Sequence, residues 1–99
     1  MPQQLESKTN KHLYLTKFRG DVHSLVNISE EQFWLLVEIS PLHSEKVILA
    51  LRDHLVYGDQ RKIACEKNNV SAGYFSVCLR KLRQVSRVAS LLAPWYVGL

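Results

Sequence analysis

The chain has 99 residues and a mass of 11.4 kDa, which is enough for one hydrophobic core and too little to divide between two. Its hydrophobic content of 46%, with only four glycines and three prolines, is typical of a globular protein and excludes collagen-like and low-complexity classes. The net charge of +4 is unevenly spread, because residues 59–99 hold seven Lys/Arg against two Asp/Glu. This surplus favours a polyanion partner, with nucleic acid ahead of an anionic membrane surface.

Neither a membrane span nor a targeting segment is predicted. No apolar run approaches the roughly 18 residues that a span needs, and residues 1–11 lack the apolar stretch of a signal peptide. We therefore expect a soluble, cytoplasmic protein with no membrane partner. Residues 1–12 are polar, basic and aperiodic, which predicts a mobile arm, and residues 13–19 are predicted as a weak strand or a short helix. Residues 13–99 as a whole are expected to form one helical domain.

A strong helix start follows at Ser29, whose side chain can cap the amide of Gln32. The helix predicted from there is apolar on almost every side up to Ile39, which is more than its own core needs, and Ser40-Pro41 ends it. We predict that part of it meets a second subunit, with simple central burial as the alternative. The predicted interface residues are Phe33, Trp34, Leu35 and Leu36. The outward member is expected to be Trp34 or Leu35.

The next helix is predicted to begin at Ser44, or at Ser40 with Pro41 in the first helical position. Gly58 supplies the left-handed residue that closes it. Its single apolar stripe consists of Val47, Ile48, Leu51 and Leu55. His54 lies at the edge of the stripe, where a half-buried, hydrogen-bonded histidine is expected rather than a catalyst.

The last two predicted helices form a helix-turn-helix at about residues 59–93. Asp59 is expected to cap the first, which ends at about Lys67, and Ser71 to cap the long second one. Asn69 occupies the turn position that favours the left-handed conformation. The residues expected to pack where the helices cross are Ala64, Cys65, Val70, Phe75 and Cys78.

Charge favours this motif over an ordinary helical hairpin. The apolar face of the long helix comprises Phe75, Cys78, Leu79, Leu82, Val85, Ala89 and Leu92. The opposite face carries no acid and comprises Gly73, Ser76, Arg80, Arg83, Gln84 and Arg87. Small residues at its start suit close approach to base pairs, and arginines behind them suit phosphates. Phosphate contacts are predicted from Arg61, Lys62, Arg80, Lys81, Arg83 and Arg87. Base contacts are predicted from Ser71, Gly73, Tyr74, Ser76 and Val77.

No combination of residues indicates an active site. Cys65 and Cys78 lack CxxC spacing, and no histidine falls at a zinc-ligand interval beside them. We therefore expect no enzymatic activity, no metal, no cofactor and no small-molecule substrate. Trp95-Tyr96, which follow Pro94, are expected to fold back as a cap on the core, with base stacking as the alternative.

Five stretches of the chain match a known family: FWLL at 33–36, IS and HSEKVILA within 39–50, RK and CEK within 61–67, GYFS at 73–76, and LAP with Y within 92–96. With them, residues 28–96 resemble the PapB family, the adhesin (fimbrial) operon transcription regulators of enterobacteria. The resemblance implies a cytoplasmic, nucleoid-associated, oligomeric helix-turn-helix regulator of fimbrial or afimbrial adhesin operons that binds AT-rich duplex DNA. Asn68 departs from the pattern, since a bulkier apolar residue is expected there, and the N-terminal arm matches poorly.

The predicted architecture is therefore all-α, a small helical bundle whose helix-turn-helix has a long C-terminal recognition helix. Two points stay open. The bare motif favours the major groove, whereas the resemblance implies minor-groove contact, which the arm through Lys8 and Lys11 could also make. The rival function is a protein-interaction module in which the apolar helix over 29–40 captures a transcription factor and the basic face only keeps the chain soluble.

Overall fold

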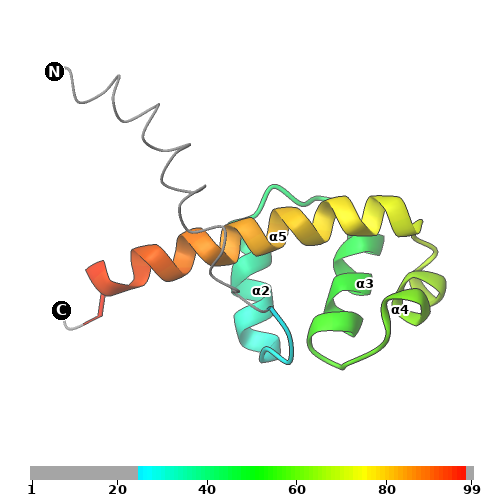
Figure 1. The fold of residues 1–99 in the computed structure, drawn as a ribbon, viewed down its shortest axis with the longest axis horizontal. Coiled ribbons are helices and arrows are strands. Elements are labelled where there is room, and N and C mark those ends of the chain that lie inside the picture. The colour runs from blue at the N-terminus through cyan, green and yellow to red at the C-terminus, as the bar shows by residue number, and fades with distance from the viewer. Residues whose placement is uncertain (1–24, 98–99) are drawn as a thin grey trace, which may run out of the picture.

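The computed structural model describes residues 25–97, and these fold into helices and their connections (Figure 1). The elements are α2 (Glu30–Glu38), α3 (Glu45–Leu55), α4 (Arg61–Asn68), α5 (Ala72–Leu92) and the short 3-10 helix η1 (Ala93–Trp95). No strand occurs in this part of the chain, so the predicted all-α fold class is confirmed. The arm expected at residues 1–12 and the element expected at residues 13–19 lie outside the described residues.

Serine side chains begin three of the helices, as the sequence predicted. The hydroxyls of Ser29, Ser44 and Ser71 each accept a hydrogen bond from the backbone amide three residues further on, at 3.0, 3.4 and 3.2 Å. Each cap satisfies one of the amides that a helix start leaves without a partner. The helix α2 ends just before Ser40, whose hydroxyl donates to the carbonyl of Val37 at 2.7 Å.

The start of α4 differs from the prediction, because Asp59 does not cap it. The N-cap residue is Gln60, which makes no side-chain hydrogen bond to the helix. The carboxylate of Asp59 instead accepts a hydrogen bond from Nζ of Lys67 at 2.6 Å. Lys67 lies in the last turn of α4, so the carboxylate of Asp59 binds a side chain at the end of the helix and does not bind the amides at its start.

Residues with positive φ mark the turns. Gly58, with φ of 83°, follows the end of α3, and Asn69, with φ of 60°, ends α4, both as predicted. Asn27, with φ of 53°, is a third such residue that the sequence did not single out. Asparagine tolerates this conformation better than most other residues, so the two Asn positions suit the turns in which they lie.

The helices pack around one core. α5 runs along one side of the domain, and α2, α3 and α4 lie against it in that order toward its N-terminal end (Figure 1). The buried apolar residues are Leu25, Phe33, Leu36, Leu42, Val47, Ala50, Leu51, Leu55, Ala64, Cys65, Phe75, Cys78, Leu79 and Leu82. The predicted stripe of α3 is confirmed, because Val47, Leu51 and Leu55 are buried and Ile48 packs against the core.

Of the four interface residues predicted in α2, two are buried and two are exposed. Phe33 and Leu36 are buried in the core of their own chain, so assigning them to an interface between subunits was wrong. The reason is that α2 packs against both α3 and α5, which cover this side of it without a second chain. Trp34 and Leu35 are exposed, and a role for them between subunits stays a prediction.

The end of α5 also differs from the prediction. Beyond α2 the last turns of α5 and the following η1 project from the rest of the helices, so Leu92 is exposed rather than part of the buried face. Trp95 and Tyr96 are exposed as well and do not cap the core, because α5 is the one helix of the described residues against which η1 packs. Among the described residues, no helix combines the length and hydrophobicity that crossing a membrane requires.

Candidate nucleic-acid interface

A tight turn joins α4 to α5. Asn69 takes the left-handed conformation, and the amide of Val70 donates to the carbonyl of Cys65 at 2.9 Å. The predicted packing residues meet here: Ala64, Cys65, Phe75 and Cys78 are buried, and Val70 packs on them from a partly buried position. Both cysteines are free, and burial raises the pKa of the Cys65 thiol. Cys65 is therefore a packing residue with little thiolate character.

Arg61 bridges the two helices at their exposed side. Its Nη2 atom donates a hydrogen bond of 2.7 Å to the hydroxyl oxygen of Ser76 on α5. Its guanidinium carbon also lies 5.4 Å from the centre of the Phe75 ring, within the range of a cation–π contact. One side chain thus ties the first turn of α4 to the first half of α5. The sequence predicted both polar residues as contacts to DNA but not their contact with each other.

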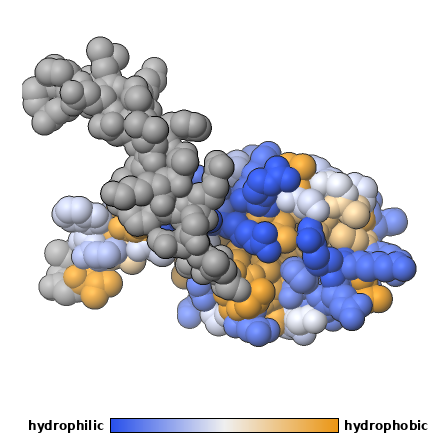
Figure 2. All heavy atoms as spheres, in the orientation of Figure 1, coloured by the Kyte–Doolittle hydropathy of each residue, from blue (hydrophilic) through white to orange (hydrophobic). Residues whose placement is uncertain are grey.

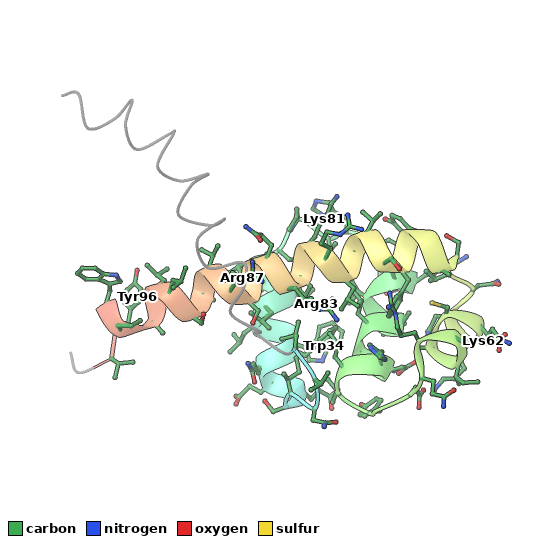
Figure 3. The ribbon with its side chains drawn as sticks, viewed as in Figure 1. Trp34, Lys62, Lys81, Arg83, Arg87 and Tyr96 are labelled. Carbon is green, nitrogen blue, oxygen red and sulfur yellow. The ribbon has the colours of Figure 1, made fainter. Side chains whose placement is uncertain are left out.

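The first turn of α4 has an unusual distribution of charge. Its first two residues are the cations Arg61 and Lys62, both exposed, and it contains no acid. Figure 3 labels Lys62 on this helix. The positive end of the helix dipole disfavours cations, and no side-chain cap occupies the free amides. An external anion bound there would be attracted by the two cations and would accept hydrogen bonds from the free amides, because a helix N-terminus with free amides binds phosphate and carboxylate groups.

The exposed flank of α5 continues this positive charge. Arg80 and Arg83 are exposed, and Arg87 is partly buried. With Arg61 they form what we call the basic strip. The Nε atom of Arg87 is buried and makes no hydrogen bond in the described part of the chain. No acid occurs between residues 70 and 97. On the face that Figure 2 draws, hydrophilic side chains lie among hydrophobic ones over the helical body.

The structure separates the predicted contact residues onto two flanks of α5. Gly73 and Ser76 lie on the side of the basic strip, as their spacing of about 100° per residue requires. Tyr74, Val77 and Lys81 lie on the other flank, and Lys81 leaves α5 on the opposite side from Arg83 (Figure 3). Tyr74 is half exposed, and a hydrogen bond with the Cys78 thiol raises the pKa of its hydroxyl. Ser71 uses its hydroxyl as the cap of α5.

A buried carboxylate fixes α4 on α3. Asp53 is buried, and its oxygens accept hydrogen bonds from Nη2 of Arg52 at 3.0 Å and from Nδ2 of Asn68 at 2.9 Å. Nζ of Lys67 lies 3.6 Å away. Burial by itself raises the pKa of Asp53, but the two hydrogen bonds and the charges of Lys67 and Arg52 outweigh it and hold the pKa below its ordinary value. The sequence analysis did not predict this network.

His54 is half-buried and hydrogen-bonded, as predicted. Its Nδ1 atom donates to the carbonyl oxygen of Asp59 at 2.8 Å, and its ring meets the Phe75 ring edge to face at 5.7 Å between centroids. The side chain therefore holds the connection before α4 against α5. Among the described residues, no group of three or more His, Cys, Asp or Glu is placed to hold a metal ion.

The family of adhesin biosynthesis transcription regulatory proteins, PapB, matches residues 6–96 of the chain. The chain belongs to the PapB family. Among its relatives in Escherichia coli, the AFA-III adhesin operon regulatory protein is 48% identical over 86 residues, which cover 87% of this chain and 85% of the relative. The F1845 adhesin operon regulatory protein is 55% identical over 69 residues, 70% of this chain and 81% of the relative.

The fold of this PapB-family chain is also that of a solved relative. The crystal structure of E. coli FocB matches it with a TM-score of 0.73 at 44% identity, over 88% of this chain and 99% of FocB. The predicted resemblance is therefore confirmed. The match from residue 6 onward includes part of the N-terminal arm, where a poor match was expected. Membership of the PapB family makes the chain a transcriptional regulator of adhesin operons, and the names of its relatives describe regulators rather than enzymes.

Proposed function

We propose that the surface formed by the start of α4 and the basic strip binds double-stranded DNA, and that the chain regulates adhesin operons by binding AT-rich sites as an oligomer. The charge supports a DNA partner, because the basic strip runs along one flank of an acid-free α5. Membership of the PapB family supports the same partner, since transcription regulators commonly act on DNA. The preference for AT-rich sites rests on the family resemblance.

The observation that carries the proposal is the cationic, uncapped start of α4, which the contact from Arg61 to Ser76 holds beside α5. Two cations at this end oppose the helix dipole, and each unfavourable charge of this kind costs about 0.3–1 kcal/mol. A DNA phosphate placed there is attracted both to the two cations and to the positive helix end, which offsets this cost, and it also accepts hydrogen bonds from the free amides. The arrangement therefore favours a bound phosphate.

Gly73 supports close approach of a ligand to the first turn of α5. A Cβ atom at this position would meet nothing within 4 Å, so packing inside the chain does not require a glycine. Glycine in a helix is unfavourable relative to alanine, by about 0.5–1 kcal/mol in the interior. A base pair or sugar that comes close to the backbone provides a reason for the missing side chain. Gly73 and Ser76 are then the candidates for contact with bases on the flank of the basic strip.

Fluorescence anisotropy with three duplexes tests the proposal. The first is AT-rich, the second is GC-rich, and in the third inosine–cytosine pairs replace the A·T pairs of the first. An inosine–cytosine pair presents the minor-groove edge of A·T and the major-groove edge of G·C. We expect salt-dependent binding to all three and tighter binding to the AT-rich duplex. Equal binding of the first and third duplexes indicates minor-groove reading, and loss of the preference in the third indicates the major groove.

Alanine substitutions identify the flank that faces DNA. Arg80→Ala and Arg83→Ala should weaken binding to all duplexes in proportion, and each should lower the slope of log affinity against log salt by about one. Lys81→Ala, on the other flank of the same helix, should have the smaller effect. If folded Arg80 and Arg83 variants bind as tightly as the parent across a salt series, the surface does not bind DNA. The rival proposal then applies, in which the exposed apolar residues of α2, such as Leu35, capture another protein.

A further inference from the structure

A pocket lies in the angle between α4 and α5. The two helices meet at the end of the domain away from η1 (Figure 1), and the pocket between them has a volume of about 410 Å³. Cys65 and Phe75 are buried and form its bottom, and the half-buried Val70 and the exposed Ala72 add apolar walls. Binding sites for small molecules are commonly concave, largely apolar and of this size. The pocket can therefore hold an apolar group.

The rim of the pocket carries two cations against one acid. Arg61 and Lys62 line it, both are exposed, and neither forms an ion pair within the described residues. In that part of the chain Arg61 donates through Nη2 to the hydroxyl of Ser76, another lining residue, and its other guanidinium donors stay available to a ligand. A planar carboxylate accepts from two such donors at once. Glu66 is the one acid that lines the pocket.

We propose that this pocket binds a small carboxylate with an apolar body, an aromatic or branched aliphatic acid, as a regulatory ligand and not as a substrate. The apolar body lies against Val70 and Phe75, and the carboxylate lies at the rim on the guanidinium of Arg61. A DNA phosphate satisfies the rim but not the bottom of the pocket, because it carries no apolar group to place against Phe75. The combination of an apolar bottom and a cationic rim selects a ligand that has both parts.

The position of the pocket links this ligand to DNA binding. Arg61 lines the pocket and also belongs to the basic strip, and Lys62 and Ser76 are candidate contacts to DNA as well. One guanidinium cannot donate the same hydrogen bonds to a ligand carboxylate and to a DNA phosphate. The ligand and DNA therefore weaken each other's binding by the same factor. This effect on DNA rests on the proposed function, whereas occupation of the pocket does not.

Benzoate is the probe for the pocket, and two controls separate its parts. Benzamide has the same shape without the charge, and acetate has the carboxylate without the ring. In full-length chain, the ring current of benzoate should shift the NMR signals of the Val70 and Ala72 methyl groups, with a dissociation constant of about 1 mM. Benzamide and acetate should bind at least about tenfold more weakly, since each lacks one of the two parts.

Three results of this titration overturn the proposal. The first is the absence of saturable shifts at Val70 and Ala72. The second is benzamide binding as tightly as benzoate, which would remove the role of the cations. The third is a set of shifts at Val88 in place of Val70 and Ala72, because Val88 lines a different groove that has no charged side chain. Benzoate would then bind wherever apolar surface is exposed.

Charge variants of the rim test the site in two directions. Arg61→Gln should weaken benzoate binding about tenfold, because it removes the partner of the carboxylate. Glu66→Gln should tighten it about threefold, because it removes the acid that opposes the carboxylate. A gain in affinity cannot result from loss of the fold. Lys46→Gln is the matched control, since Lys46 is exposed on α3 and does not line the pocket. Equal affinities in all three variants overturn the proposal.

Anisotropy with one short duplex tests the consequence for DNA. Sodium benzoate at ten times its dissociation constant should raise the apparent dissociation constant of the duplex about tenfold. Sodium chloride at the same concentration controls for ionic strength and should raise it less. Equal effects of the two salts would overturn the regulatory role. A chain that binds benzoate at Val70 and Ala72 but binds no duplex contradicts the proposed function and still supports the pocket as a carboxylate site.

Discussion

The amide nitrogen of the Asn68 side chain lies 2.9 Å from a carboxylate oxygen of Asp53 and 2.8 Å from the carbonyl oxygen of Ala64. One side chain thus joins a buried acid of α3 to the backbone of α4. A charge buried without a donor is costly, whereas a buried carboxylate with several donors is stable. The polar residue at this corner, where the resemblance to the PapB family implied an apolar one, is the partner of Asp53.

Replacing Asn68 should destabilise the fold. Asn68→Ala leaves one carboxylate oxygen of Asp53 without its closest donor, and we expect a loss of about 1–3 kcal/mol in the free energy of unfolding. Asn68→Leu should also destabilise, although the apolar residue matches the pattern expected at this corner. Urea denaturation measures both. Glu66→Ala, exposed on the same helix, is the control and should change stability by less than about 0.5 kcal/mol.

A double-mutant cycle separates this contact from other effects of the substitution. If Asn68 acts through Asp53, the combined change of both residues to alanine should cost less than the sum of the single changes. Additive losses, within about 0.3–0.5 kcal/mol, would show that Asn68 stabilises the corner by another route.

Stability should depend on pH through Asp53. Its pKa is lower in the folded chain than in the unfolded chain, so the unfolded state binds more protons in acid. The stabilisation is therefore complete above the unfolded pKa of this group and is lost as the pH falls through the folded pKa. Urea denaturation from about pH 7 down to pH 3, with the parent and with Asp53→Asn, checks this. The stability difference between the two proteins should shrink as the pH falls, and a constant difference contradicts the prediction.

The helices could be predicted because their signals are local. The caps at Ser29, Ser44 and Ser71, and the left-handed turns at Gly58 and Asn69, depend on residues within a few positions of each other. The errors involve distant contacts. Whether Phe33 faces the core or another subunit depends on α3 and α5, and whether Trp95 covers the core depends on where α2 ends along α5. The hydrophobic pattern of a single helix predicts neither the burial of Phe33 nor the exposure of Trp95.

The same distinction applies to the candidate interface. The residue types on the flank of the basic strip followed from helical spacing, but the partners of those residues did not. Arg61 and Ser76 are 15 residues apart, as are Asp53 and Asn68, and both pairs form across the junction of two helices. A single sequence gives no sign of which polar residues will meet there. The misplaced cap at Asp59 has the same cause, since Lys67 was not recognised as its partner.

Arg61 should act on DNA both as a charge and as a positioning residue. Arg61→Ala should weaken binding to AT-rich and unrelated duplexes alike and lower the salt slope by about one. Arg61→Lys keeps the charge but not the planar guanidinium, which donates to Ser76 and lies against Phe75. It should therefore retain the salt slope and reduce the preference for the AT-rich duplex. Anisotropy titrations at several salt concentrations measure both quantities.

Ser76→Ala provides the comparison for Arg61. If the contact between the two side chains positions the surface, Ser76→Ala and Arg61→Lys should reduce the preference by similar factors, and the double variant should be no worse than either alone. Arg61→Lys with the full preference of the parent would indicate that Arg61 contributes charge only.

Gly73→Ala separates stability from recognition. The open space around this position and the higher helix propensity of alanine predict a more stable chain, by about 0.5 kcal/mol. If DNA approaches the backbone closely at this turn, the same methyl group must weaken binding, most of all to the AT-rich duplex. Thermal denaturation and anisotropy on one preparation give both results. Ala72→Gly is the reverse control on the neighbouring exposed residue, and it should destabilise α5 without tightening binding. A Gly73→Ala chain that is more stable and binds every duplex as the parent does would show that the first turn of α5 stays clear of the bases, and base contacts would then have to come from the flank that carries Tyr74 and Val77.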